Sequence, residues 1–331
     1  MWPSLREIQD TLRVVALPMA TRFRGVTERE VALFEGPEGW AEFSPFVEYA
    51  DAEAATWLAA AIDYAWHPQP APRRESVGVN ATVPAVTDVA AVLARFPGCR
   101  TAKVKVAEPG QRLADDIARV RAVREILGPE GRVRIDANGA WNIDEAEHAI
   151  HTLAEFDLEY AEQPCASIDE LAELRRRVHH TGIPIAADES VRKATDPLAV
   201  ARAGAADLLV VKAQPLGGVA RALQIVAEAG LPAVVSSALD SAVGLSQGTA
   251  LAAALPTLDF DCGLGTAALF LEDVADRMPA NGALPTGRVT PDPAALTRLA
   301  ASAERTAWWH ARIERCYALV PAASGSAAVG E

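Results

Sequence analysis

Cysteine is scarce in this chain of 331 residues: there are four, and none stands in a Cys-x-x-Cys pair. A disulfide-stapled scaffold needs more cysteines at closer spacing. The composition therefore excludes that class and favours a globular protein of a reducing, cytoplasmic compartment.

Positive charge and long apolar runs are also lacking. The net charge is −13, whereas a nucleic-acid binder needs a basic surface. The first turns carry Arg6, Glu7 and Asp10, so we expect no signal peptide. The most apolar stretch, 231–255, is broken by a proline, an aspartate and a glycine, so we expect no membrane span. A small anionic partner stays compatible with the composition, because a site can be locally positive.

From about residue 76 the chain alternates regularly between short β-branched runs and amphipathic segments. Helical stretches such as 112–127 and 142–155 separate the runs, and Asn142 and Glu145 are placed to cap the second of them. Strands that alternate with helices predict parallel βαβ units. The eight strand candidates are 77–81, 102–106, 133–137, 158–162, 184–188, 208–212, 233–237 and 258–262.

Eight such units suit a closed barrel better than an open doubly wound sheet, and no Gly-x-Gly-x-x-Gly follows any strand candidate. We therefore predict an α/β fold, a modified (β/α) barrel of the TIM type over 76–284. A smaller α+β capping domain is predicted over 1–75. The proline-containing segment 285–320 is predicted to pack back on this cap, and 321–331 to be a disordered tail.

Ionisable residues stand at the same place on five successive strand candidates. They are Lys103 and Lys105, then Asp136, Glu162, Asp188 and Lys212. The last four are spaced by 26, 26 and 24 residues, one βα unit each. Barrel active sites lie at the carboxyl ends of the strands, and residues i and i+2 of a strand share a face. A single acid at a strand end usually caps the next helix or pairs with a neighbour. Ionisable residues at the same place on five successive strands instead predict an active site.

The carboxylates of Asp136, Glu162 and Asp188 form an all-oxygen donor set. Such a set suits Mg²⁺, with Mn²⁺ as a substitute, better than Zn²⁺. The six histidines fall on expected helices or outside the barrel strands, so they offer no zinc site. Burying so many charges is costly unless a metal or partner charges compensate. The three carboxylates are therefore predicted metal ligands.

The lysines beside them predict proton abstraction next to a carboxylate. Removing that weakly acidic proton leaves an enediolate with two negative oxygens, which a divalent cation stabilises. The base must be neutral when it acts, and neighbouring cations favour the neutral form of a lysine. Lys105 and Lys212 would approach the substrate from opposite faces, since their strands lie across the barrel.

At these residues the sequence resembles the enolase superfamily, over nearly the whole chain. The Lys103-Val104-Lys105 motif, the three carboxylates and Lys212 carry the resemblance, together with the Asp-Ala-Asn at 136–138 and the Glu-Gln-Pro-Cys at 162–165. Gln163 departs from the pattern, because an acid is common there in relatives. The superfamily implies Mg²⁺ and a lysine base.

Within the superfamily the chain looks most like the o-succinylbenzoate synthases. The stretches that carry this likeness are 39–45, 79–81, 216–218, 236–241 and 263–266. The resemblance implies a lyase that converts 2-succinyl-6-hydroxy-2,4-cyclohexadiene-1-carboxylate into 2-succinylbenzoate by syn dehydration, in menaquinone biosynthesis. Ala238, inside a run of serines, departs from the pattern.

The same resemblance implies individual roles. Lys105 would take the proton and then assist departure of hydroxide from the same face. Lys212 would stabilise the anion from the other face, and Lys103 would orient the carboxylate and favour the neutral form of Lys105. Substrate contacts are implied for Arg24 in a mobile cap loop and for Asn138, Ser236, Ser237, Gly263 and Leu264.

Three other interpretations stay open. An N-succinylamino acid racemase or dipeptide epimerase of the same superfamily needs both Lys105 and Lys212 as acid–base groups, and both are present. A Schiff-base lyase with Lys212 as the covalent amine does not need the carboxylates. A binding or scaffolding protein would not need the lysines. The oligomeric state is also open, with a monomer compatible with the sequence.

Overall fold

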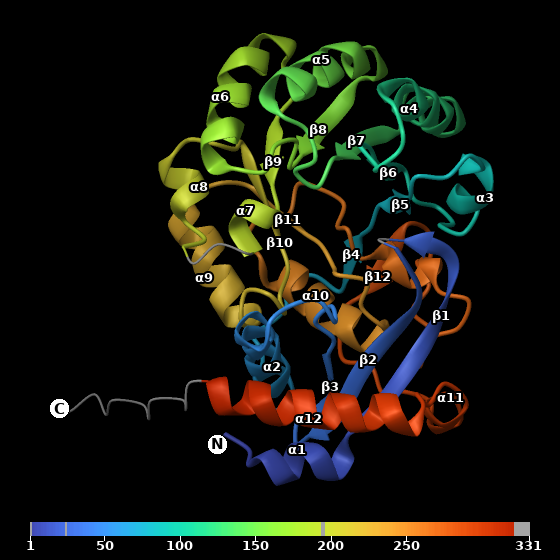
Figure 1. Ribbon diagram of the computed structural model, residues 1–331, viewed down its shortest axis with the longest axis vertical. Coiled ribbons are helices and arrows are strands. Elements are labelled where there is room, and N and C mark those ends of the chain that lie inside the picture. The colour runs from blue at the N-terminus through green and yellow to red at the C-terminus, as the bar shows by residue number, and fades with distance from the viewer. Residues whose placement is uncertain (1, 24, 193–195, 321–331) are drawn as a thin grey trace, which may run out of the picture.

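The computed structural model describes residues 2–23, 25–192 and 196–320 of the chain. Within these ranges the chain forms a small part that contains both ends of the described chain and a larger part built on a parallel sheet (Figure 1). The tail predicted to be disordered, 321–331, lies outside the described residues.

The smaller part is the capping domain predicted from the sequence. Helix α1 (Leu5–Thr11) leads into an antiparallel sheet in the order β1–β2–β3, and helix α2 packs against β2 and β3. Helix α2 is rich in alanine, which loses no side-chain entropy in a helix. The bounds are β1 Arg13–Phe23, β2 Val26–Gly36, β3 Gly39–Phe43 and α2 Asp51–Trp66.

The C-terminal segment returns to this cap. Helix α12 (Ala303–Leu319) lies along α1 and α2 (Figure 1). Trp309 of α12 is buried edge-on against Phe43, with the ring centroids 5.8 Å apart. Arg305 donates to both carboxylate oxygens of Glu30 at 2.7 Å. An aromatic contact and a two-pronged ion pair therefore join the end of the chain to its beginning.

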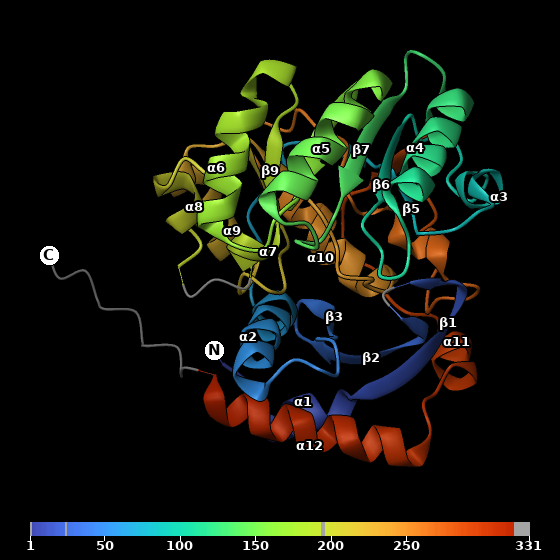
Figure 2. The same ribbon diagram turned by 45° about the horizontal axis from the view of Figure 1, so that its top comes forward.

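The larger part is a curved sheet of seven parallel strands in the order β5–β6–β7–β8–β9–β10–β11. Its strands are almost entirely buried, because helices such as α4, α5, α6 and α9 cover the outside of the sheet (Figure 2). The strands are β5 Ala81–Val83, β6 Thr101–Lys105, β7 Arg132–Asp136, β8 Leu158–Glu162, β9 Ile185–Ala187, β10 Leu208–Val211 and β11 Ala233–Val235. The helices of this part are α3 Val89–Leu93, α4 Leu113–Leu127, α5 Ile143–Leu153, α6 Ile168–Val178, α7 Glu189–Arg192, α8 Ala199–Arg202, α9 Val219–Ala229 and α10 Ala242–Ala254, with 3₁₀ turns η1 Ala154–Phe156, η2 His179–Thr181 and η3 Gly265–Leu269. Helix α11 (Pro293–Arg298) lies with the cap, beside β1.

Two of the eight strands expected from the sequence differ in the structure. The first, 77–81, is divided: β4 (Ser76–Gly78) pairs with β12 (Ala283–Pro285), and only β5 enters the parallel sheet. The last, 258–262, is reduced to single bridges from Cys262 to Val79 and from Gly263 to Ser236, which close the ring between its two edges. A buried guanidinium explains part of this shortening. Arg134 donates a hydrogen bond to the carbonyl of Asp261 at 2.7 Å, so this carbonyl bonds a side chain instead of a neighbouring strand.

The fold class, an α/β barrel with a smaller cap, is confirmed. The sheet of β4 and β12 lies where the sequence places the two crossings between cap and barrel, at 75/76 and 284/285. We retain those boundaries as a proposal. Among the described residues no helix combines the length and the apolarity needed to cross a membrane.

The helix start predicted near residue 142 is confirmed by its hydrogen bonds. Asn142 Oδ1 accepts from the N–H of Glu145, and Glu145 Oε2 accepts from the N–H of Asn142, both at 3.0 Å. Ser167 and Glu170 form the same reciprocal pair at the start of α6. These caps fix where each helix leaves its strand, and so where the strand-end residues lie.

Candidate active site

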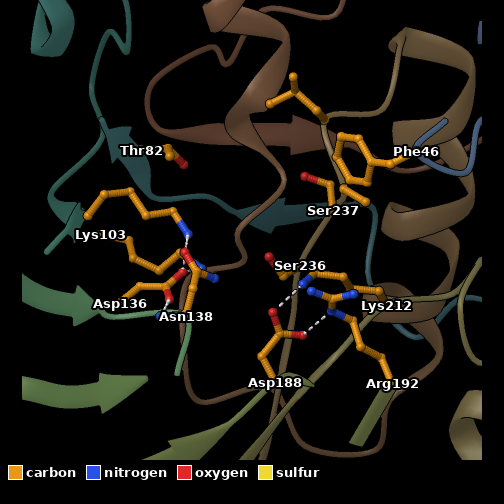
Figure 3. Close-up of a pocket in the computed structure, with 13 residues that line it drawn as sticks. Phe46, Thr82, Lys103, Asp136, Asn138, Asp188, Arg192, Lys212, Ser236 and Ser237 are labelled. Atoms are coloured by element: carbon orange, nitrogen blue, oxygen red, sulfur yellow. Dashed lines mark hydrogen bonds and ion pairs between the residues drawn. The ribbon is translucent and has the colours of Figure 1, made fainter. Parts of the chain in front are cut away.

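The predicted strand-end charges gather at one mouth of the barrel. Lys105, Asp136 and Glu162 end β6, β7 and β8, and they are successive Cα partners in the parallel ladders. Asp188 and Lys212 follow β9 and β10 directly. Because parallel strands in register bring their carboxyl ends together, side chains from strands far apart in the sequence surround a single cavity (Figure 3). Its lining is Phe46, Thr82, Lys103, Lys105, Asp136, Asn138, Asp188, Arg192, Lys212, Ser236, Ser237, Ala238 and Leu239.

One side of the cavity is a lysine–carboxylate group on β6, β7 and β8. Lys103 Nζ donates to the two oxygens of Glu162 at 2.7 and 2.9 Å and lies 3.0 Å from Asp136 Oδ2. Burial would lower the pKa of Lys103, but Asp136 and Glu162 outweigh it and raise that pKa well above the ordinary lysine value. Lys103 is therefore a fixed positive charge beneath the cavity.

Lys105 belongs to the same lysine–carboxylate group and lies nearer the mouth of the cavity. Its Nζ donates to Asp136 Oδ2 and, at 2.7 Å, to Asn138 Oδ1. Asn138 is held in turn by its own N–H, which donates to Asp136 Oδ1 at 3.0 Å, and by its side-chain amide, which donates to Glu189 at 3.2 Å. Its backbone is left-handed, with φ of 49°, a conformation that asparagine tolerates better than most residues. The turn after β7 therefore aims an amide oxygen at the Lys105 amine.

The other side of the cavity carries Lys212, Asp188 and Arg192 (Figure 3). Lys212 Nζ lies 2.5 Å from Asp188 Oδ2, and Arg192 Nε lies 3.0 Å from Asp188 Oδ1. Burial lowers the pKa of Lys212 and the Arg192 guanidinium lowers it further, although Asp188 opposes both. Burial alone would raise the pKa of Asp188, but Arg192 and Lys212 hold it below the usual range. Asp188 is thus an anion between two cations.

The carboxylates suit a hard divalent cation by donor chemistry, because all their donors are oxygen. Burial and the Asp136 carboxylate raise the pKa of Glu162 to about 7, so added positive charge beside it would favour its charged form. In the described part of the chain, however, no three acidic, histidine or cysteine side chains stand close enough together to hold a metal ion. The lysine ammonium groups occupy the carboxylate oxygens, and they would have to move aside for all three carboxylates to share one cation.

Of the remaining predicted contact residues, some line the cavity and others do not. Ser236 and Ser237 line the cavity beyond β11. Gly263 and Leu264 are not in its lining: Gly263 lies behind Ser236, so close that a Cβ would stand 2.5 Å from Ser236 Oγ, and Leu264 is fully buried. Arg24 lies outside the described residues.

Five residues that line the cavity are not among the predicted site residues: Phe46, Thr82, Arg192, Ala238 and Leu239. Arg192 is the most consequential, and its signal was its place four residues after Asp188, a spacing that pairs charges on a helical turn. It also donates to Tyr49 Oη at 3.3 Å and so reaches the cap. Phe46 follows a cap motif and Thr82 lies on β5, and neither type carries a chemical signal by itself.

Gln163 departs from the superfamily pattern, and both polar atoms of its side chain form hydrogen bonds in the structure. Its side-chain amide donates to the Cys165 carbonyl at 2.9 Å and to Ser190 Oγ at 2.7 Å. Its oxygen accepts from the N–H groups of Asp188 and Ser190 at 2.9 and 3.2 Å. Gln163 therefore fixes the backbone that carries Asp188 through its side-chain oxygen, and its amide also supplies two donors, to Cys165 and Ser190, that a carboxylate lacks.

Gln163→Glu is therefore expected to destabilise the protein. A buried carboxylate would face the Cys165 carbonyl without a proton to donate, which costs about 1–3 kcal/mol. Urea unfolding at neutral pH measures the change. Gln224→Glu, on the exposed face of α9, is the matched control and should leave the unfolding midpoint almost unchanged. Equal stability of Gln163→Glu and wild type would contradict this account of Gln163.

Comparison with known proteins first defines the class. A family model described as enolase C-terminal domain-like matches residues 85–287, and one described as enolase N-terminal domain-like matches residues 14–65. The fold is similar to muconate lactonizing enzyme from Pseudomonas putida, with a TM-score of 0.71, 20% identity and coverage of 88% of this chain and 98% of that one. It is also similar to N-succinyl Arg/Lys racemase from Bacillus cereus, with a TM-score of 0.72, 18% identity and coverage of 88% and 97%.

Closer relatives define the family. The chain is 57% identical to o-succinylbenzoate synthase of Mycobacterium leprae over 98% of this chain and 97% of that one. It is 59% identical to o-succinylbenzoate synthase of Mycobacterium tuberculosis over 96% and 97%. The chain therefore belongs to the o-succinylbenzoate synthase family of the enolase superfamily, and it is an enzyme of the lyase class.

Proposed function

We propose that this enzyme catalyses the Mg²⁺-dependent syn dehydration of 2-succinyl-6-hydroxy-2,4-cyclohexadiene-1-carboxylate to 2-succinylbenzoate, a step of menaquinone biosynthesis in the cytoplasm. The observation that carries the proposal is the pair of lysines on opposite sides of one cavity, each bonded to a carboxylate of a neighbouring strand. The high identity to proteins named for this product supports it. Purified enzyme given this substrate, with and without added Mg²⁺, tests it through the change in ultraviolet absorbance as the ring becomes aromatic.

Lys105 Nζ acts as the base in this proposal. In its neutral form it takes the proton from the ring carbon that bears the carboxylate, and the electron pair left behind expels hydroxide from the neighbouring carbon. The protonated Lys105 gives its proton to that hydroxide on the same face, so one water leaves and the ring becomes aromatic. Asn138 Oδ1, which accepts a hydrogen bond from Nζ at 2.7 Å, holds the amine in place before and after the transfer.

The remaining charges stabilise the anion that forms when the proton leaves. Lys103 is a fixed cation beneath the cavity, and Lys212 offers its ammonium from the opposite side. A divalent cation held by Asp136, Glu162 and Asp188 would supply Lewis-acid stabilisation of the substrate carboxylate. Mn²⁺ is a suitable substitute for Mg²⁺ by the same donor chemistry. The partner is thus a small carboxylate, and no nucleic acid or membrane is required.

An N-succinylamino acid racemase activity is the second candidate. It is favoured by the placement of Lys105, which donates to Asp136 and Asn138, across the cavity from Lys212, which donates to Asp188. Racemisation needs one acid–base group on each face, whereas the dehydration needs only one. The Lys212 variants separate the two activities.

Lys212→Ala is expected to lower the dehydration rate by about 10- to 10³-fold, because one electrostatic contact is lost while the base remains. Lys212→Arg keeps a cation but cannot exchange protons, so it should recover part of the dehydration rate. Both variants should abolish exchange of deuterium into, and racemisation of, N-succinyl amino acids. Complete loss of dehydration in Lys212→Arg with the fold intact would argue that Lys212 also transfers a proton in this reaction.

A further inference from the structure

Arg29 is a buried cation that lies outside the cavity and has no place in the chemistry above. It stands on β2 of the cap and is 3% exposed. Its Nε donates to the carbonyl of Leu239 at 3.2 Å, and one terminal nitrogen donates to the carbonyls of Ser44 and, at 3.3 Å, Ala238. Its guanidinium carbon lies 4.3 Å from the centre of the Phe46 ring. One side chain thus joins a cap loop to the loop that follows β11.

Both loops form part of the cavity wall. Phe46 comes from the cap loop, and Ala238 and Leu239 come from the barrel loop, next to Ser236 and Ser237. Removing the guanidinium would release the carbonyl groups that fix this wall while leaving every charged cavity residue in place. Arg29 therefore acts on the substrate site only through other residues.

The orientation of the barrel loop has a chemical consequence. The chain has no cis peptide bond among the described residues, so each N–H points away from the carbonyl of its own peptide unit. Since the carbonyls of Ala238 and Leu239 face Arg29, the N–H groups of Leu239 and Asp240 point away from it. Neither N–H has a hydrogen-bond partner in the described part of the chain, although both residues are buried. Buried N–H groups without partners are rare, and that of Leu239, which lines the cavity, suits an acceptor on a ligand.

Two buried carboxylates near Arg29 also hold the loop that follows β11. The Glu42 carboxylate accepts from the N–H groups of Ser241 and Gly244 at 2.9 and 3.2 Å, at the start of α10. Asp240 Oδ1 accepts from the N–H of Ala238 at 3.2 Å. Burial and the Glu42 charge raise the pKa of Asp240 to about 7, and the Arg29 cation counteracts this. The Arg29 cation thus acts electrostatically on both buried carboxylates, Glu42 and Asp240, and favours their charged forms.

We propose that Arg29 is a positioning residue for the second carboxylate of the substrate, the one on its aliphatic tail. By holding the carbonyls of Ala238 and Leu239, it presents the N–H of Leu239 to that carboxylate and keeps Phe46 against the tail. The inference rests on the proposed function for the identity of the ligand. It adds a residue of the cap that sets affinity without touching the reacting atoms.

Binding of two ligands by calorimetry in the presence of Mg²⁺ tests the proposal. 2-Succinylbenzoate carries the tail carboxylate, and 2-butanoylbenzoate has a methyl group in its place. Wild type should prefer the first by about 10-fold or more, the size expected for hydrogen bonds to a charged group. Arg29→Met should lose this preference, binding 2-succinylbenzoate about 10-fold more weakly and 2-butanoylbenzoate within about threefold of wild type. Arg29→Lys, which keeps the charge with fewer donors, should recover part of the preference.

The matched control is Arg277→Met. Arg277 is as buried as many core residues, but it donates to Thr249 Oγ1 and the Pro285 carbonyl, which are not part of the cavity wall. This variant should lose stability while keeping the ligand preference and the KM. In steady-state assays Arg29→Met should raise KM about 10-fold with kcat within about threefold, a division that a general loss of stability does not produce.

Amide hydrogen exchange of the ligand-free protein supplies a readout that needs no activity. Arg29→Met should exchange faster over 236–241 than Arg277→Met does, with 133–138 unchanged in both. Equal affinity of wild type for the two ligands, or retained preference in Arg29→Met, would overturn the inference. Turnover by wild type without any tail preference would refute the role of Arg29 alone, whereas absence of both turnover and binding would refute the proposed function as well.

Discussion

Lys105→Ala is expected to lower kcat by about 10³-fold or more, because the proton then has no acceptor at the reacting face. The fold should persist, since Asp136 keeps Lys103 as a partner at 3.0 Å after the truncation. Steady-state kinetics of the dehydration, with circular dichroism and thermal unfolding on the same samples, measure both effects.

Lys105→Arg separates the charge of this residue from its basicity. A guanidinium keeps the positive charge beside Asp136 but does not give up its proton. It should therefore be as inactive as the alanine variant while retaining near wild-type stability. Substantial dehydration by Lys105→Arg would mean that Lys105 acts only as a cation, and the base would have to be sought on the Lys212 side of the cavity.

Asp188→Asn is expected to have the second largest effect. It removes an anionic oxygen from the proposed metal site and leaves Lys212 and Arg192 without their shared carboxylate. We expect Mg²⁺ affinity to fall at least about 10-fold and kcat/KM to fall by about 10²- to 10⁴-fold, the range for lost ligands and lost electrostatic groups. Titration of Mg²⁺ into EDTA-treated protein, followed by activity and by calorimetry, gives both numbers.

Asp196→Asn is the matched control for this experiment. Asp196 lies in the same stretch of chain, but its side chain is half exposed and pairs with Arg202. Its replacement should change neither Mg²⁺ affinity nor turnover. Unaltered Mg²⁺ affinity in Asp188→Asn would show that this carboxylate serves only as the partner of Lys212 and Arg192.

The fold was predictable because it depends on periodic patterns. The alternation of apolar runs and amphipathic segments gave the parallel sheet, and the Asn142 cap gave the start of α5. The pairing of 76–78 with 283–285 was not predictable, because it joins segments about 200 residues apart through backbone hydrogen bonds alone. The shortening of the eighth strand was not predictable for the same reason. It depends on the hydrogen bond from Arg134 to the carbonyl of Asp261, a residue 127 positions further along the chain.

The candidate site was predictable where residue type carries chemistry. The lysines and acids at the strand ends were found by phase alone, and a further signal supports them: the chain has four lysines, three of which line the cavity. Arg29 and Phe46 were beyond prediction, because their relevance arises only when the cap folds over the barrel. The opposite holds for Gly263 and Leu264, which the sequence placed at the substrate and the structure places behind the wall.

A Schiff-base lyase remains distinguishable by experiment. Lys212 would then form a covalent imine, which borohydride reduction traps and which mass spectrometry assigns readily in a chain with four lysines. We expect no trapped adduct and complete loss of activity with EDTA. A scaffolding protein without activity would instead be indicated if Lys105→Ala left every measurable property of the protein unchanged.

The most direct test of the account is turnover of 2-succinyl-6-hydroxy-2,4-cyclohexadiene-1-carboxylate by purified enzyme after EDTA treatment, before and after Mg²⁺ is restored. We expect no absorbance change before restoration and rapid aromatisation after it, with Lys105→Ala inactive under both conditions. Aromatisation at full rate in the presence of EDTA would contradict the metal-assisted mechanism. Absence of turnover in restored enzyme would contradict the proposed dehydration and leave proton abstraction from N-succinyl amino acids as the activity to be measured.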